Sequence, residues 1–330
     1  MFAGQCAQVA CTPQGGSRSR PCGDVALDRG LRNDSGPAMP ARDLLFMLFI
    51  NAIWGLAMIP ASVALRHFPP LEFTWFRFML LSAVLAPFFL RWRPGQMRMI
   101  FYAALAGGTF NFALLFLGVA IAGEVGPVAI AGQLGVPFTT ILSILILGEV
   151  IRWRRWTGIG LAFVGVVIIG FDPRVIHYWE GFLIVVASAF VGALSSIILR
   201  QIRDVPVFEM QAWIATISWP LLMLMSFAFE SDQWTKAVTA PWSAWGGVFY
   251  TALMSSLVAH AGFYWMLQRY EVSKVSPLTT LSPIFTVVFA VLILHEPLTT
   301  QFVVGAAVTL LGVWIITLRE PEKIRGPAVQ

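Results

Sequence analysis

Long uninterrupted apolar segments recur along this 330-residue chain, each about 20 residues long, the length that crosses the hydrocarbon core of a bilayer. The chain is 58% hydrophobic and 12% charged, whereas a soluble domain carries about 25% charged residues. The sequence therefore predicts an all-α integral membrane protein with ten transmembrane helices. The predicted spans are Leu44–Ala64, Leu71–Leu90, Met99–Ala122, Gly126–Leu147, Trp156–Phe171, Gly181–Leu199, Phe208–Phe229, Ala244–Leu267, Ser276–Leu294 and Phe302–Leu318.

Basic residues are unevenly divided between the loops, and this predicts the orientation. With a cytoplasmic N-terminus, the outer loops hold only Arg66, Arg174 and Lys236. The inner loops hold Arg42, Arg91, Arg93, Arg98, Arg152, Arg154, Arg155, Arg200, Arg203, Arg269, Lys274, Arg319, Lys323 and Arg325. Cytoplasmic loops carry the excess of Lys and Arg, so we expect a multi-pass protein of the inner (plasma) membrane with both termini in the cytoplasm. The same distribution explains the net charge of +5 without a nucleic-acid partner.

The two halves of the chain repeat one another. A shift of 147 residues places Leu145-Ile146-Leu147-x-Glu149 on Leu292-Ile293-Leu294-x-Glu296, and Gly158 and Gly165 on Gly305 and Gly312. A shift of 137 places Gly55, Pro69 and Glu72 on Gly192, Pro206 and Glu209. Because each half has five spans, an odd number, the second half must enter the membrane inverted. Inverted five-helix repeats are the architecture of many secondary transporters.

The segments outside the spans have a different composition. Residues 1–40 are rich in Gly, Pro, Ser and Arg and predict a disordered tail, or an upstream extension of a chain that starts at Met39. Residues 319–330 form a predicted cytoplasmic tail. Cys6, Cys11 and Cys22 all precede the first span, with no His at zinc-finger spacing, so neither a metal site nor a disulfide framework is expected.

Few polar side chains lie inside the predicted spans, and these are the candidate substrate-binding residues. Arg77 is the most informative, because a permanent cation within a bilayer must pair, snorkel or face a polar cavity. It would bind an anionic group of a substrate, or it would bind backbone carbonyls of a neighbouring helix. The other candidates are Asn51, Trp54, Asn111, Gln133, His260 and Tyr264. Each polar group among them, like Gln211, could instead simply bridge helices.

Prolines interrupt spans 4 and 9, which occupy corresponding positions in the two halves. A proline frees the carbonyl four residues earlier, and that carbonyl needs a partner within the bundle. Interrupted spans at matching positions mark the binding site of many transporters, although kinks that serve packing alone are the alternative. The expected helix-break and gating residues are Pro127 and Pro137 in span 4 and Pro277 and Pro283 in span 9.

Two acidic residues open spans, each three residues after a proline. Glu72 follows Pro69, and Glu209 follows Pro206. We interpret both as carboxylates that stabilise the positive ends of their helices. A role in binding a coupling ion is the alternative.

The motifs resemble those of the EamA family of the drug/metabolite transporter superfamily. They are Trp54-Gly55, Pro69-Pro70, Phe76-Arg77-Phe78, and the two copies of Leu-Gly/His-Glu followed by Gly-x6-Gly, and they cover residues 44–318. Arg269-Tyr270-Glu271 followed by Val275-Ser276-Pro277-Leu278 is most similar to the O-acetylserine/cysteine exporter branch. The resemblance implies two EamA-type repeats, at residues 44–171 and 179–318, and a central cavity.

Other functional classes lack their motifs. The sequence contains neither the His-Glu-x-x-His of zinc proteases nor a Walker A loop, and no Asp lies within a predicted span. We therefore expect no enzyme activity and no cofactor. We expect instead a secondary transporter that exports small metabolites such as amino acids or their derivatives by alternating access. A lipid flippase of the same fold is the alternative, and a homodimer is also compatible with the sequence.

The topology can be tested with reporter fusions. Because the loops that contain Arg174 and Lys236 are poor in basic residues, we expect reporters fused after either residue to lie outside the cell. An alkaline phosphatase fusion should be active at both positions and a fluorescent protein fusion should be dark. Cytoplasmic reporter activity at both positions would contradict the orientation.

Overall fold

The structure is a computed structural model that describes residues 39–270 and 275–318. The chain divides into Met1–Pro40 and Ala41–Gln330, and the fold is that of the second unit. The expectations for residues 1–38, which include the three cysteines, and for residues 271–274 and 319–330 lie outside the described residues. Every regular element in the described part of the chain is a helix.

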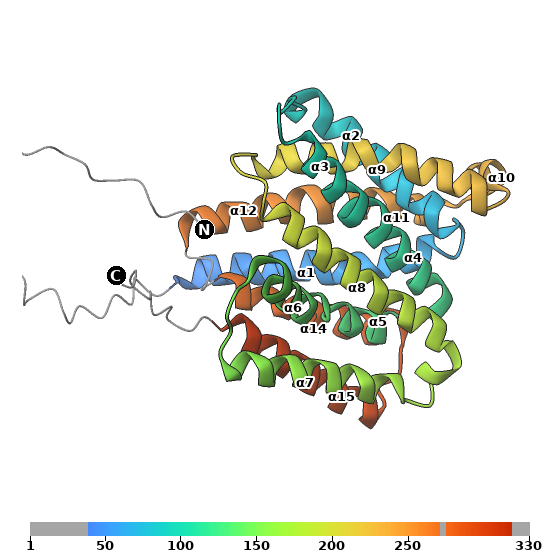
Figure 1. The fold of residues 1–330 in the computed structure, drawn as a ribbon. Coiled ribbons are helices and arrows are strands. Elements are labelled where there is room, and N and C mark those ends of the chain that lie inside the picture. The colour runs from blue at the N-terminus through green and yellow to red at the C-terminus, as the bar shows by residue number, and fades with distance from the viewer. Residues whose placement is uncertain (1–38, 271–274, 319–330) are drawn as a thin grey trace, which may run out of the picture. The chain divides into compact units, whose positions relative to one another are not determined.

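The helices follow the predicted apolar segments to within a few residues at each end (Figure 1). The first half contains α1 (Ala41–Ala64), α2 (Pro70–Phe89), α3 (Met97–Ala103), η1 (Ala104–Phe110), α4 (Asn111–Ala122), α5 (Val125–Gly132), α6 (Gly135–Leu147) and α7 (Trp153–Gly170). The second half contains η2 (Val175–Tyr178), α8 (Trp179–Leu199), α9 (Val207–Phe229), α10 (Gln233–Thr239), α11 (Trp242–Phe249), η3 (Tyr250–Ala259), α12 (His260–Arg269), η4 (Ser276–Thr280), α14 (Leu281–Leu294) and α15 (Thr300–Thr317).

Eight of these helical segments are long and apolar enough to cross a membrane. The short α7, which opens with Arg154 and Arg155 in its first turn, and the continuous segment from α11 to α12 are not among the eight. The structure thus establishes an all-helical fold with many membrane-length helices, while the full set of ten spans stays a prediction. The short helix α10 was not predicted from the sequence.

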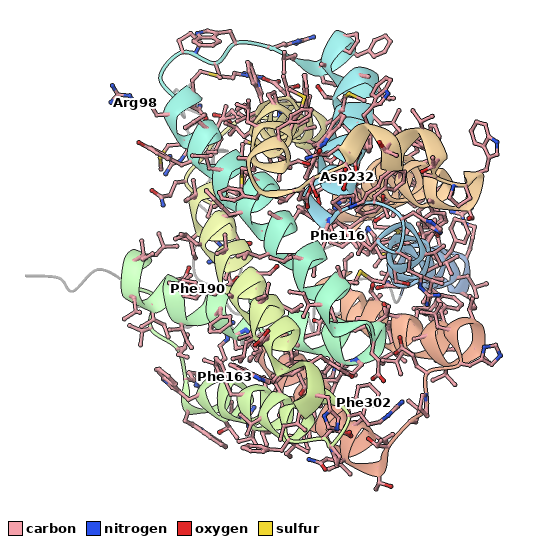
Figure 2. All side chains as sticks on the ribbon, turned by 90° about the vertical axis from the view of Figure 1, so that its right-hand side faces the viewer. Arg98, Phe116, Phe163, Phe190, Asp232 and Phe302 are labelled. Atoms are coloured by element: carbon pink, nitrogen blue, oxygen red, sulfur yellow. The ribbon has the colours of Figure 1, made fainter. Side chains whose placement is uncertain are left out.

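The two halves pack together through pairs of helices, and each pair contains one helix from each half. The α2 helix packs against α9, α4 against α8, and α7 against α15. The α1 helix runs between the group of α2 and α9 and the group of α7 and α15, and it contacts α11, η3 and α14 (Figure 1). The core between these helices is apolar, and Figure 2 shows the side chain of Phe116, which is 3% exposed, in the interior.

Several membrane-length segments are not regular α-helices. The segment from α3 to α4 contains the π-helical η1, and the segment from α11 to α12 contains the π-helical η3. Span 4 is broken by a turn at Gln133 and Leu134 between α5 and α6, and span 9 begins with the 3-10 turn η4 before α14. The irregularities fall on corresponding segments of the two halves, and they include both segments that the prolines mark.

The repeated Leu-Gly/His-Glu motif ends a helix in the same way in both halves. Gly148, after α6, has a φ of 67°, and His295, after α14, has a φ of 57°. The next amide, of Glu149 or Glu296, donates to the carbonyl of Ser143 or Ala290 six residues earlier. This is the left-handed helix end of a Schellman motif, so the motif places a glutamate immediately beyond each helix.

The glycines of the second repeated motif allow α7 and α15 to pack backbone against backbone. A Cβ atom at Gly165 would lie 2.4 Å from the amide nitrogen of Thr309, and one at Gly312 would lie 2.5 Å from that of Ala162. Real side chains do not approach backbone atoms this closely, so the contact requires glycine at both positions. Close backbone approach through small residues is a common means of membrane helix association.

Substitution of Gly165 tests this packing. Gly165→Ala should lower the thermal stability of the purified protein, because the methyl group forces the helices apart at a cost of about 1–3 kcal/mol. Gly160→Ala, on the same helix, is the matched control, since a Cβ atom there has no neighbour within 4 Å. The measurement is thermal unfolding in detergent followed by tryptophan fluorescence. Equal unfolding temperatures for the two variants would contradict the close packing.

Candidate functional site

A cavity of about 540 Å³ opens between α6, α8 and the end of α15. This volume lies within the range of about 300–1,000 Å³ that small-molecule sites occupy. The break between α5 and α6 forms part of its wall, because Gly132 and Gly135 both line it. The full lining is Asn111, Gly132, Gly135, Val136, Thr139, Thr140, Ser143, Glu149, Arg155, Ala189, Gly192, Ala193, Ser196, Arg200, Ile316 and Thr317.

Polar groups of two kinds line the cavity. Hydroxyl groups come mostly from α6, where Thr139 and Thr140 each donate to the carbonyl four residues earlier and keep their oxygen as an acceptor. Charged groups lie at the end where α6 and α8 finish. There the Glu149 carboxylate accepts from Arg200 at 3.2 Å. The half-buried Arg155 guanidinium has no such carboxylate partner among the described residues.

Asn111 lies at the inner part of this lining and joins α4 to α8. Its Oδ1 accepts from the Ser188 hydroxyl at 3.0 Å, and its Nδ2 donates to the Gly107 carbonyl at 3.3 Å. Gly192 faces the same amide, since a Cβ atom there would lie 2.9 Å from Asn111 Oδ1. Of the substrate-binding residues predicted from the sequence, Asn111 is the one that lines this cavity.

Three other predicted residues converge on the π-helical segment η3. Trp54 Nε1 donates to the Ser255 carbonyl at 3.2 Å, and His260 Nδ1 lies 2.8 Å from the same oxygen. Their rings meet edge to face, with centroids 5.2 Å apart. A π-helix leaves carbonyls out of the regular i→i+4 pattern, so these side chains satisfy backbone groups that η3 exposes.

Arg77 is the third residue bound to η3. Its Nη2 donates to the Ser256 hydroxyl at 2.8 Å, and its Nε donates to the Thr251 carbonyl at 3.4 Å. The guanidinium also stacks over the Phe112 ring, with 4.3 Å from Cζ to the centroid. Nη1 is buried without a hydrogen-bond partner in the described residues. These contacts match the alternative in which Arg77 binds backbone of a neighbouring helix, and Arg77 does not line the open cavity.

The remaining predicted residues are dispersed. Asn51 is fully buried and donates to the Met47 carbonyl of its own helix, while its Oδ1 has no partner among the described residues. Tyr264 lies against Phe208, with ring centroids 6.5 Å apart. Gln133 occupies the turn between α5 and α6. The observed cavity includes residues of α7 and α15 as well as of α4, α5, α6 and α8.

The prolines lie at the starts of the interrupted segments. Pro127 and Pro137 fall in the first turns of α5 and α6, where the missing N–H removes no intrahelical bond. Pro277 lies in η4, and Pro283 in the first turn of α14. Segments 4 and 9 are thus both irregular, and the helix-break and gating roles of these four residues stay a proposal.

Opposite the charged mouth, the start of α5 is held by a carboxylate from the other half. Glu296, which follows α14, accepts from the amides of Val125 at 2.6 Å and Gly126 at 2.9 Å. Desolvation by burial raises the pKa of Glu296. Nearby, Glu124 pairs with Arg174 at 3.2 Å and accepts from the Tyr178 hydroxyl. Only a small space of about 10 Å³ remains between these groups, so the structure is closed here.

The structure gives Glu209 a partner that the sequence did not predict, while the Glu72 carboxyl group has no hydrogen-bond partner among the described residues. Neither side chain caps its own helix. Glu209 forms a bidentate ion pair with Arg93, with both N–O distances 2.7 Å, and this hydrogen bonding raises the pKa of Arg93. The first amides of α2 are capped instead by Glu230.

Sequence reasoning also missed the π-helical segments and the capping by Glu230 and Glu296. The adjacent Gly107 and Gly108 in η1 were a usable signal, because the Ser195 and Ser218 hydroxyls approach closely at these two positions. Asp43 was placed in a loop, yet it lies in the first turn of α1 and accepts from the Tyr270 hydroxyl. The described residues contain no group of three or more His, Cys, Asp or Glu side chains that could hold a metal ion.

A bundle of apolar, membrane-length helices with a polar cavity of small-molecule size is typical of a polytopic membrane protein. The model of the EamA-like transporter family matches residues 42–171 and again 179–318. The chain therefore belongs to the EamA-like transporter family.

Relatives and solved structures agree with this assignment. The chain is 27% identical to a "Probable amino-acid metabolite efflux pump" of Salmonella typhimurium, over 84% of this chain and 95% of that protein. It is 26% identical to a protein of the same description from Escherichia coli, with the same coverage. A solved crystal structure aligns with a TM-score of 0.56 at 17% identity, over 84% of this chain and 96% of that chain, and shows a shared fold.

The role of Arg77 can be tested by comparing the stabilities of two variants, Arg77→Ala and Arg77→Lys. Arg77→Ala removes both donors to η3, and we expect it to lower the free energy of unfolding by about 2–3 kcal/mol, because charged hydrogen bonds of this kind are worth about 1.5–3 kcal/mol. Arg77→Lys should lie between this variant and the wild type, since it keeps the charge and loses the fork. Thermal unfolding is the measurement. A fully stable Arg77→Ala protein that no longer transports would assign Arg77 to substrate binding instead.

Proposed function

We propose that this protein is a secondary transporter that exports small amino-acid-like metabolites by alternating access. The observation that carries the proposal is the open polar cavity of about 540 Å³ at one end of the bundle, opposed by a closed end. A transporter must expose its site to one side at a time, and a structure with one open and one closed end has the form that this requires.

The distribution of basic residues gives the orientation of this conformation. Glu149, Arg155 and Arg200 at the cavity mouth belong to loops that the excess of Lys and Arg predicts to be cytoplasmic. The closed end, where Glu296 binds the start of α5, belongs to the predicted outer side. The conformation would then accept solutes from the cytoplasm, as an exporter must do before it releases them outside.

Pairwise packing supports ten spans in two inverted repeats. Gly158 and Gly165 of α7 contact Gly312 and Gly305 of α15, in antiparallel order. The shift of 147 places Gly158 on Gly305 and Gly165 on Gly312, so the two contacts are reciprocal, as a two-fold axis between inverted halves would make them. The π-helical segments η1 and η3 also correspond, because each lies within the third predicted span of its half. The α7 helix and the segment from α11 to α12 would complete the ten spans.

The chemistry of the cavity favours a small zwitterion. Arg155 and Arg200 are suited to a carboxylate, and Glu149 is suited to an ammonium group. The hydroxyls of α6 and the amide of Asn111 provide neutral donors and acceptors further along the lining. The two enterobacterial relatives described as amino-acid metabolite efflux pumps support the same substrate class.

Filling the cavity tests the proposal. Gly132 lines the cavity and a Cβ atom there has no neighbour within 4 Å, so Gly132→Trp should fold and occupy the space that a substrate needs. We expect efflux of O-acetylserine or cysteine from loaded proteoliposomes to fall by about tenfold or more, because a large side chain then fills a small-molecule site.

Gly160→Trp is the matched control, because Gly160 is exposed, has the same free space and does not line the cavity. It should transport at the wild-type rate. Efflux by Gly132→Trp equal to that of the control would contradict the cavity as the substrate route. Movement of labelled lipid, with no efflux of either amino acid, would favour the flippase alternative.

A further inference from the structure

The start of α2 contains a buried carboxyl group without a partner. Glu72 is 1% exposed, and neither of its carboxyl oxygens has a hydrogen-bond partner among the described residues. The other buried acidic side chains among the described residues all have hydrogen-bond partners. Asp43 binds Tyr270, Asp172 binds Thr299, and Glu209 binds Arg93.

A second carboxyl group lies at the same helix start. Glu230, immediately after α9, accepts from the amide of Leu71 at 2.7 Å, from the amide of Glu72 at 3.0 Å and from the Ser226 hydroxyl at 2.7 Å. The turn between α9 and α10, where Asp232 is labelled in Figure 2, lies beside the start of α2. The Glu230 carboxyl group thus has three hydrogen-bond donors, whereas that of Glu72 has none among the described residues.

The internal repeat allows the Glu72 and Glu230 positions to be compared with the equivalent positions in the other half. Under the shift of 137, Glu72 corresponds to Glu209 and Arg93 corresponds to Glu230. In one copy this position in the loop after the second helix of the half is Arg93, which pairs with Glu209 at the start of α9, at 2.7 Å. In the other copy, a glutamate takes the place of the arginine. One copy therefore has an ion pair where the other has two acids.

Among residues 39–270 and 275–318, no basic side chain forms a hydrogen bond with the Glu72 carboxyl group. The charged groups that act on it are Glu230 and Lys236, and the Lys236 ammonium donates to the Ser231 carbonyl. Arg66 and His67, in the preceding loop, are exposed. The other elements packed against α2, namely α4, α11 and η3, carry no acidic or basic residue, and the Tyr250 hydroxyl of η3 donates to the Ile53 carbonyl.

Burying an ionised carboxylate without a partner is far more costly than burying a neutral carboxylic acid. Of two carboxyl groups that share a site, one retains its proton to higher pH. Because Glu230 has three donors and Glu72 has none, the proton belongs to Glu72.

We propose that Glu72 is a proton-binding site, occupied in this conformation, whose proton keeps the start of α2 against the end of α9. Loss of the proton places two carboxylates together in a poorly solvated site, and their repulsion separates the two helices at this end. Acid closes this end and alkali opens it. The site goes beyond the transport function proposed above, because it makes the closed state depend on pH whatever the substrate is.

Infrared spectroscopy tests the proton directly on the full chain in nanodiscs, without a substrate. The carbonyl stretch of a protonated carboxyl group should persist in the wild type well above about pH 4.3, where ordinary glutamates ionise. Glu72→Gln should lower the intensity of this band to what the half-buried Glu296 contributes, because desolvation also raises the pKa of that carboxyl group. Glu209→Gln, the matched position of the other repeat, should leave the intensity unchanged. A wild type without the band, or equal intensity in the wild type and Glu72→Gln, would overturn the proposal.

Hydrogen–deuterium exchange tests the link to conformation. After correction for intrinsic rates, exchange in peptides covering residues 68–78 should rise about tenfold as the band disappears with increasing pH, because the helix start opens locally. Glu72→Gln should stay protected throughout. Exchange that is independent of pH in the wild type, or equally pH-dependent in Glu72→Gln, would overturn the coupling.

Glu230→Gln provides a second test that does not alter Glu72. Without the neighbouring charge, Glu72 should ionise at lower pH, so its infrared band should disappear earlier than in the wild type. An unchanged titration would show that the two carboxyl groups do not interact and would overturn the proposal. Exchange that responds to sodium and not to pH would assign the site to a metal cation instead and would overturn it equally.

Discussion

Backbone amides at the starts of helices must find acceptors wherever the chain lies in a low-dielectric environment, and this requirement determines how the two halves meet. The first amides of α2 bind the carboxylate of Glu230, and those of α5 bind the carboxylate of Glu296. Both acceptors come from the second half and serve helices of the first. Each follows the end of a long helix, so one short segment finishes its own helix and caps another.

The two ends of the bundle differ because these contacts gather at one of them. At the end that holds Glu230 and Glu296, helix starts are capped and little free space remains. At the other end, residues of α6, α8 and α15 line the polar cavity. The interrupted and π-helical segments lie between, and their exposed carbonyls are satisfied by side chains such as Trp54 and Arg77. Such segments can change their internal bonding more readily than a regular helix can.

Sequence symmetry and structural asymmetry coexist in this protein. The glycine contacts of α7 and α15 preserve the repeat, since the Gly158–Gly312 contact is matched by the Gly165–Gly305 contact between the corresponding residues. The contacts of α2 and α9 break it, because Arg93 pairs with Glu209 at one end while Glu230 lies with Glu72 at the other. A duplicated fold offers the same geometry twice, and an arginine in one copy where the other has a glutamate gives an ion pair at one end and two neighbouring acids at the other.

The sequence by itself determined the helical class, the bounds of the helices and the family. These properties depend on the length of apolar segments and on local signals such as Pro69 and Gly148, which act within a few residues of the chain. It also located the breaks in spans 4 and 9, because a proline acts on its own helix. It did not determine the surroundings of Arg77, Glu72 and Glu209. Those residues contact groups more than a hundred positions away, so their environment depended on which helices pack together. The tertiary structure alone decided that Arg77 binds η3, that Glu209 is paired, and that Glu72 is buried without a partner.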